Sequence, residues 1–155
     1  MLEKGADPDG RGIDGTTPLT VAAFQFETDI VGLLHSCGAD LELGNLWGQK
    51  PLFCACQGGM ENTPEELPDQ KRLNIVTLLL GRGAEVEGAD NECWTPLRQA
   101  VLASHDTDLA GLLLQNGAKP NETDHSGVTP LQLAEQQCSS EMVELLRGYV
   151  NAKAI

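Results

Sequence analysis

The sequence predicts an all-α repeat solenoid, a stack of similar helix pairs, because two short phrases recur along it in step. The first is Pro-Leu preceded by Thr or Lys, and its copies are Thr17-Pro18-Leu19, Lys50-Pro51-Leu52, Thr95-Pro96-Leu97 and Thr129-Pro130-Leu131. The second is Gly-Ala followed by a polar residue, and its copies begin at Gly5, Gly38, Gly83 and Gly117. Both series have intervals of 33, 45 and 34 residues. Two markers that share one irregular spacing indicate a repeat array.

The first helix of each unit is predicted to begin at the proline of the Pro-Leu phrase. A proline in the first turn lacks only an N–H that has no helical partner, and a preceding Thr is a favourable N-cap. Small and apolar residues follow, and they allow a neighbouring helix to approach closely. These stretches are Val21-Ala22-Ala23, Cys54-Ala55-Cys56, Gln99-Ala100-Val101 and Leu133-Ala134.

A second helix follows in each unit, because apolar residues recur there at helical spacing. They are Ile30, Val31, Leu33 and Leu34; Ile75, Val76, Leu78, Leu79 and Leu80; Leu109, Leu112, Leu113 and Leu114; and Met142, Val143, Leu145 and Leu146. Gly38, Gly83 and Gly117 are expected to end these helices as left-handed caps. About ten polar, Gly-rich residues then form a turn before the next proline. One such unit cannot bury its apolar stripe alone, whereas stacked units can.

This unit resembles the ankyrin repeat, which has a similar period and a Thr-Pro-Leu-His-x-Ala signature. The resemblance covers residues 1–150. The signature His is absent from all four units, where the residues are Thr20, Phe53, Arg98 and Gln132. Lys50 replaces the Thr of the second unit, and Cys93 replaces the Gly two residues before Thr95. We expect these departures to affect local capping hydrogen bonds but not the fold.

We expect a single ankyrin-repeat domain over residues 1–155. Its predicted parts are a partial repeat 1–10, repeats 12–44, 45–89 and 90–123, and a C-terminal capping repeat 124–155. The start within a repeat suggests either a fragment of a longer array or a gene that begins there, and we favour the fragment. The cap is predicted because Glu135 stands where earlier units carry small or apolar residues, and because a last repeat needs a polar outer face.

The second repeat contains an insert, predicted over 58–74, which is rich in proline, glycine and acids. The simpler interpretation is a solvated surface loop, since lengthening a loop costs little entropy. The alternative is an interaction loop, because inserts in repeat arrays often lie on a binding face.

The composition narrows the classes of partner and compartment. A net charge of −13 argues against nucleic acid and anionic lipid, which require positive surfaces, and favours a basic partner. No run of 18 apolar residues is present, so we expect no membrane insertion. The five cysteines have no zinc-ligand spacing and are expected to be reduced, which predicts a cytoplasmic or nuclear protein. We expect a monomer.

No catalytic motif is present: the sequence lacks GxSxG, HExxH, a Walker-type loop and GxGxxG. The three histidines fall at different positions of different units. We therefore expect a non-enzymatic protein that uses no cofactor and no metal.

The ankyrin resemblance implies protein binding through a concave surface, which is formed by the turn tips and the exposed sides of the first helices. The candidate partner-binding residues carried over in this way are Ile13, Asp14, Phe24, Leu46, Trp47, Gln49, Asn91, Glu92, Trp94, Leu102, His125 and Val128. Exposed tryptophans are typical of binding hot spots. The alternative is that each Trp packs against a neighbouring turn.

We hypothesise that the concave surface binds a basic or mixed basic and apolar segment of a partner, with Trp47 and Trp94 as anchors and the acidic turns steering the encounter. The alternative is a structural spacer segment of a longer array, without a partner of its own. Asn121 occupies an Asn position that the family can hydroxylate, although a role in stabilising the turn is the simpler expectation.

Overall fold

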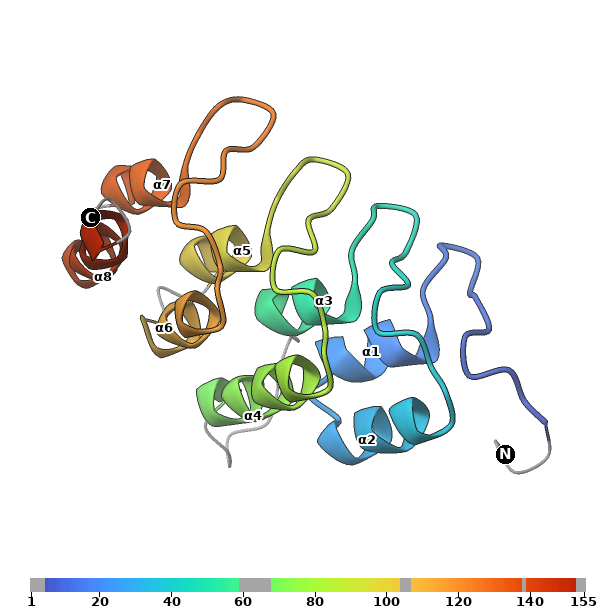
Figure 1. Ribbon diagram of the computed structural model, residues 1–155. Helices are drawn as coiled ribbons and strands as arrows, with labels where there is room; N and C mark the ends of the chain where they lie inside the picture. Colours follow the sequence, from blue (N-terminus) through green and yellow to red (C-terminus); the bar gives the residue numbers. More distant parts are fainter. Residues whose placement is uncertain (1–4, 59–67, 104–106, 138, 153–155) are drawn as a thin grey trace.

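The computed structural model describes residues 5–58, 68–103, 107–137 and 139–152. Within these ranges the chain forms helices and no strand. The helices are α1 (Pro18–Phe24), α2 (Thr28–Ser36), α3 (Pro51–Gln57), α4 (Pro68–Gly81), α5 (Pro96–Ala103), α6 (Thr107–Gln115), α7 (Pro130–Gln136) and α8 (Ser140–Ala152). They lie in two rows, with α1, α3, α5 and α7 side by side in one row and α2, α4, α6 and α8 in the other (Figure 1). The predicted all-α repeat solenoid is confirmed.

The first helices begin at the predicted prolines, but their caps differ from one helix to the next. The Thr17 hydroxyl accepts from the Thr20 N–H at 3.1 Å, and the Thr20 hydroxyl oxygen accepts from the Thr17 N–H at 2.9 Å. Thr129 and Gln132 form the same reciprocal pair on α7. The expected effect on capping is therefore absent from these two helices, because Thr and Gln also provide an acceptor. It is confirmed for α3, where Lys50 forms no side-chain cap.

The core runs through the whole stack as one cluster of buried side chains. The small residues predicted for the first helices lie in its centre, and Ala23, Cys56 and Ala100 are fully buried. The larger side chains come mainly from the second helices, where Ile75, Leu109 and their neighbours pack against the adjoining pairs. No helix within the described ranges is both long and apolar enough to cross a membrane.

A left-handed glycine lies two residues after the end of α2, α4 and α6, as predicted. Gly38 has a φ of +92°, and the N–H of Ala39 donates to the carbonyl of Leu34 at 3.0 Å. Gly83 and Gly117 have the same left-handed conformation, with φ values of +97° and +99°. These bonds satisfy carbonyls that a helix end leaves without partners.

Cys93 adopts a left-handed conformation in a turn where the equivalent residues of the other units are glycines. Its φ is +59°, while Gly15, Gly48 and Gly127 have values between +75° and +77°. The N–H of Cys93 still donates to the Asp90 carbonyl at 3.1 Å, so the turn keeps its shape. A residue with a Cβ is strained in this region, so Cys93 costs local stability.

The predicted insert loop over 58–74 is wrong for its last part. Pro68 begins α4, so residues 68–74 are helical, and 59–67 lie outside the described residues. A proline suits the first turn of a helix, and Asp69 lies in that turn 3.6 Å from the Arg72 guanidinium. The half-buried Leu73 packs on the core, and Arg72 lies over the Phe26 ring at 5.6 Å. The longer α4 thus gains contacts with the preceding helix pair.

Successive turns are joined by acidic side chains that accept hydrogen bonds from the backbone of the next unit. Asp9 accepts from the N–H of Asp40 at 2.9 Å, and Glu42 accepts from the N–H of Glu85 at 2.8 Å. Glu87 accepts from the N–H of Lys119 at 3.0 Å. Asn121 follows these three acids in the repeat register. Its modification stays a prediction.

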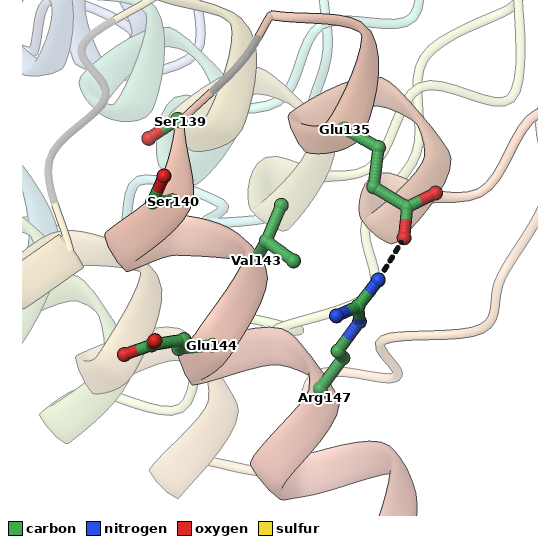
Figure 2. A pocket seen from close by; sticks show the side chains of 6 residues that line it. All are labelled: Glu135, Ser139, Ser140, Val143, Glu144 and Arg147. Atoms are coloured by element: carbon green, nitrogen blue, oxygen red, sulfur yellow. Dashed lines mark hydrogen bonds and ion pairs between the residues drawn. The ribbon is translucent and has the colours of Figure 1, made fainter.

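The two ends of the described stack have different chemical character. On the α1–α2 end, Ile30 is 46 % exposed and Leu33 56 % exposed. Ile30 has the same repeat position as Ile75, Leu109 and Met142, each of which is 0 % exposed because the preceding helix pair covers it. The α7–α8 end is polar, and there Glu135 accepts from Arg147 at 2.7 Å (Figure 2). The role of residues 124–155 as a C-terminal capping repeat and the repeat boundaries stay predictions.

Candidate functional site

The first three turns present their tips in a row, because each tip is bonded to the next. The N–H of Leu46 donates to the Asp14 carbonyl at 3.0 Å, and the N–H of Asn91 donates to the Trp47 carbonyl at 2.9 Å. The Asn91 side chain adds a bond to the Leu46 carbonyl at 3.0 Å. We call the surface formed by these tips and by the helices α1, α3, α5 and α7 the concave surface, after its counterpart in the resemblance.

A buried asparagine fixes the turn that carries Trp47. The Asn45 Oδ1 accepts from the N–H groups of Trp47 and Gln49, both at 3.0 Å, and its Nδ2 donates to the Gln49 side chain at 3.0 Å. Asp90 has the same function one unit later, because its Oδ1 accepts from Glu92 and Trp94, both at 2.9 Å. Side-chain acceptors of this kind stabilise turns and set the direction of the following residues.

The first hollow of the concave surface lies between the first and second units and has a volume of about 310 Å³. Its lining residues are Asp14, Thr16, Thr20, Val21, Phe24, Asn45, Trp47, Gln49, Cys54 and Gln57. Trp47 is 55 % exposed, Val21 is 43 % exposed and Phe24 is half-buried. The hollow is therefore an apolar and aromatic depression with a carboxylate at its edge.

A second hollow of about 290 Å³ adjoins the first, since Gln49 and Gln57 line both. Its other lining residues are Phe53, Asp90, Glu92, Trp94, Gln99 and Leu102. Among the described residues that line the two hollows, none is Lys or Arg. Together they form a groove with aromatic side chains and only negative formal charges.

Trp94 differs from Trp47, because one face of its ring is occupied from within the chain. The Arg98 guanidinium lies 4.9 Å from the centre of the Trp94 ring. Arg98 also pairs with the Asp124 carboxylate at 2.7 Å and donates to the Val128 carbonyl at 3.3 Å. Arg98 is buried and occupies the position of the signature His. It joins the third unit to the fourth, so packing within the stack accounts for part of the Trp94 surface.

Some carboxylates of the turns are paired with a lysine of the same chain, and others lie at the groove. Glu42 and Glu85 both contact the Lys50 ammonium at 2.9 Å. The hydrogen bond from Lys50 to Glu85 lowers the pKa of Glu85. Asp14 instead accepts from the Thr16 hydroxyl at 2.6 Å and from its N–H at 3.2 Å, and these bonds lower the Asp14 pKa. Asp14 is therefore charged at neutral pH, beside the first hollow.

The predicted partner-binding residues separate into four groups in the structure. Asp14, Phe24, Trp47 and Gln49 meet in the first hollow, and Gln49, Glu92, Trp94 and Leu102 meet in the second. Ile13, Leu46, Asn91 and His125 lie at exposed turn positions, with His125 3.9 Å from Glu92. Val128 lies apart, in a hollow of about 530 Å³ on the fourth unit.

Two columns of groove residues are absent from the predicted set. Val21, Cys54 and Gln99 share one position in the first helices, and Thr20 and Phe53 share the position before it; each lines a hollow. The repeat register could have identified them, because the carry-over considered only the C-terminal end of each first helix. Burial raises the Cys54 pKa to about 12, so this thiol is neutral and unreactive at neutral pH.

A further hollow, of about 420 Å³, lies on the polar outer face of α7 and α8. Figure 2 shows Glu135, Ser139, Ser140, Val143, Glu144 and Arg147 around it, with the Glu135–Arg147 pair across one side. Because Arg147 is paired with Glu135 and both are exposed, this hollow has the character of a solvated surface. Nowhere in the described parts of the chain do three His, Cys, Asp or Glu side chains gather as a metal site.

Comparison with known proteins adds an independent finding. The family model for ankyrin repeats, in three copies, matches residues 25–124 and 69–154. Ankyrin repeat protein YahD of Escherichia coli (strain K12) is 25 % identical over 94 % of this chain and 69 % of its own length. Ankyrin repeat and SOCS box protein 16 of Mus musculus is 36 % identical over 77 % of this chain and 25 % of its own length.

A viral relative extends the comparison over nearly the whole chain. Ankyrin repeat protein FPV031 of Fowlpox virus (strain NVSL) is 29 % identical over 97 % of this chain and 42 % of its own length. The chain thus spans less than half of two of these three relatives. Ankyrin repeats are generally protein-binding modules without catalytic activity of their own. The stacked helix pairs, the glycine-ended second helices and the family match lead to one conclusion: the chain belongs to the ankyrin repeat family.

Proposed function

We propose that this chain is a non-enzymatic protein-binding module whose concave surface takes an extended, basic and apolar segment of a partner protein. The observation that carries the proposal is the continuous groove formed by the two hollows, in which Trp47 is 55 % exposed. An exposed Trp beside apolar walls is a typical binding hot spot. When a partner covers the exposed Trp47 and the apolar walls, this surface is removed from water, which favours binding.

The acidic character of the groove supports a basic partner. The hollows are lined by Asp14, Asp90 and Glu92, and the chain has a net charge of −13. Such a surface attracts a basic segment and fixes its register more than it adds affinity. The proposal includes a monomer in the cytoplasm or the nucleus. Cys54 and Cys56 support this location, because buried neutral thiols suit a reducing compartment.

A second candidate, the structural segment of a longer array, is favoured by a separate observation. Ile30 and Leu33 are half-exposed, although residues at the Ile30 position are fully buried in the later pairs. A further helix pair placed on this end would bury them. The two candidates are compatible, since one concerns the concave surface and the other an end of the stack.

A capture experiment tests the proposed function. The tagged chain, Trp47→Ala and Leu33→Ala are compared in a cell lysate, with circular dichroism to show that all three are folded. Leu33 is a matched control, because its exposed fraction of 56 % equals that of Trp47 within one per cent and it lies outside the groove. We expect a protein that the parent and Leu33→Ala capture and Trp47→Ala loses.

Purified partner then decides between the candidates. Binding that is direct and weakened by Trp47→Ala supports the groove. Equal binding by the parent and Trp47→Ala refutes it. If binding is lost only with Leu33→Ala, the functional surface is the end of the stack, as the second candidate requires.

A further inference from the structure

The first hollow has the chemistry of a subsite for one particular side chain. Its walls are Trp47, Phe24 and Val21, and its formal charge comes from Asp14 alone, since the Cys54 thiol is neutral. A purely apolar side chain would fill the walls but leave the carboxylate without a partner. A side chain with an apolar stem and a cationic end matches both parts.

The chain itself contains an example of such a match. Arg98 stacks on Trp94 at 4.9 Å and pairs with Asp124 at 2.7 Å. Here one guanidinium lies over an indole ring and pairs with a carboxylate at the same time, as a cation with several N–H donors can. The first hollow also combines an indole with a carboxylate, but no Lys or Arg is among the described residues that line it.

The basic residues of the two neighbouring turns are already engaged, since the Arg11 guanidinium donates to the Gly44 carbonyl at 3.4 Å. Lys50 directly follows Gln49 in the turn, but its ammonium is held between Glu42 and Glu85, at 2.9 Å from each. The chain thus supplies no cation for Asp14 from this turn. Both bonds from Thr16 go to the Asp14 Oδ1, and Asp14 is an exposed residue in the lining of the hollow, so its charge is accessible to a partner.

We propose that the first hollow is an arginine subsite, in which a guanidinium of the partner stacks on Trp47 and pairs with Asp14 while the aliphatic stem packs between Phe24 and Val21. Arginine is preferred over lysine because a planar guanidinium both stacks and pairs, whereas an ammonium is more strongly hydrated. The adjoining residues of the partner continue past Gln57 into the second hollow. This inference rests on the proposed function and specifies the partner side chain.

Short peptides of defined chemistry test the inference. The probe is Ac-Leu-Arg-Leu-NH2, and its matched controls are the citrulline peptide, which is nearly isosteric but uncharged, and the lysine peptide. Each is titrated into the ¹⁵N-labelled chain while the indole N–H signals and the Thr16 amide signal are followed. The two indole signals are assigned with Trp47→Phe and Trp94→Phe. We expect the arginine peptide to shift the Trp47 and Thr16 signals, with a Kd about fivefold lower than that of the citrulline peptide.

Two variants separate the subsite from a general charge effect. Asp14→Asn keeps the acceptor oxygen for Thr16 and removes the charge, so the turn should remain folded. It should weaken the arginine peptide about fivefold and leave the citrulline peptide unchanged. Asp29→Asn, an exposed acid in the first turn of α2, removes an equal charge elsewhere and should have no effect. Trp47→Ala, followed through Thr16, should weaken the arginine peptide by at least about threefold.

The opposite outcomes are equally definite. Equal binding of arginine and citrulline peptides, or full binding by Asp14→Asn, overturns the subsite. Equal binding of the lysine peptide overturns the assignment to a guanidinium, and the absence of any shift at Trp47 overturns the inference as a whole. If a partner captured through Trp47 is found but the arginine peptide fails, the concave groove stands as the binding surface and only the arginine subsite is refuted.

Discussion

Two isoleucines at the same position of different units provide a sharp test of the stack. Ile30 lies on α2 and Ile75 on α4, and their exposed fractions are 46 % and 0 %. Truncation to alanine removes the same three carbon atoms from each. The chemistry of the change is therefore constant, and only the covering by a preceding helix pair differs.

The expected costs follow from burial. In Ile75→Ala, three buried carbons at about 0.8 kcal/mol each, together with the cavity that a packed core leaves, lower the free energy of unfolding by about 3 to 4 kcal/mol. In Ile30→Ala, about half of the side chain is already in water and solvent fills the space. The expected loss is then about 1 kcal/mol.

The measurement is urea-induced unfolding followed by far-ultraviolet circular dichroism, with the free energies obtained by linear extrapolation. An unchanged dependence on denaturant shows that both variants unfold from the same native state. If Ile30→Ala costs as much as Ile75→Ala, the end face is covered in solution and the burial argument is refuted. Repeating the unfolding measurement at several protein concentrations shows whether self-association covers the end face.

Three further predictions address other features. Cys93→Gly should raise the free energy of unfolding by about 0.5 to 1 kcal/mol in the same assay, because it relieves a φ of +59°; a loss of stability would show that the thiol packs usefully. The pKa of Asp124 is lowered, first by the Ser126 hydroxyl and then by the Val128 N–H and Arg98, so its contribution to stability is complete above the ordinary pKa of 3.8 and disappears as the pH falls below it. Asp124→Asn should therefore lose less stability than the parent over that acid range, and parallel pH profiles would contradict this. Iodoacetamide should modify the exposed Cys37 in the native chain, and peptide mass spectrometry can locate the modified residues. It should modify Cys54 and Cys56 only after unfolding, because burial raises the pKa of both thiols. Rapid labelling of Cys54 in the native chain would show that the first hollow opens.

The sequence was sufficient for the fold because the fold is periodic. Proline starts, small residues and glycine ends recur at matching positions, so each unit supports the interpretation of the others. The first turns of α4 were missed for the same reason: Pro68–Asn74 has no counterpart in the other units, and it belongs to an insert whose prolines, glycines and acids resemble a loop. Contacts such as Arg72 on Phe26, which the sequence does not show, help to explain why it is helical.

The candidate site was predictable as a surface but not as a set of interactions. The repeat register brings Trp47 and Trp94 to the same face, yet it does not show that Arg98 covers one of them. Arg98 and Asp124 are far apart in sequence, and their pairing depends on how the third unit meets the fourth. Likewise, the sequence places Glu42 and Glu87 in the acidic turns, but it does not show that each accepts a hydrogen bond from the backbone of the next turn.

The acid-to-backbone bonds between successive turns have a consequence for how the chain can change length. They join the turns just after the glycines that cap the second helices, and the bond between Glu42 and Glu85 persists although 45 residues rather than 33 separate the Pro-Leu phrases there. Material added between α3 and α4 therefore leaves the pitch of the groove unaltered. For a protein engineer this makes that connection a natural insertion point, where a reporter or a second recognition element could be added while the groove keeps its dimensions.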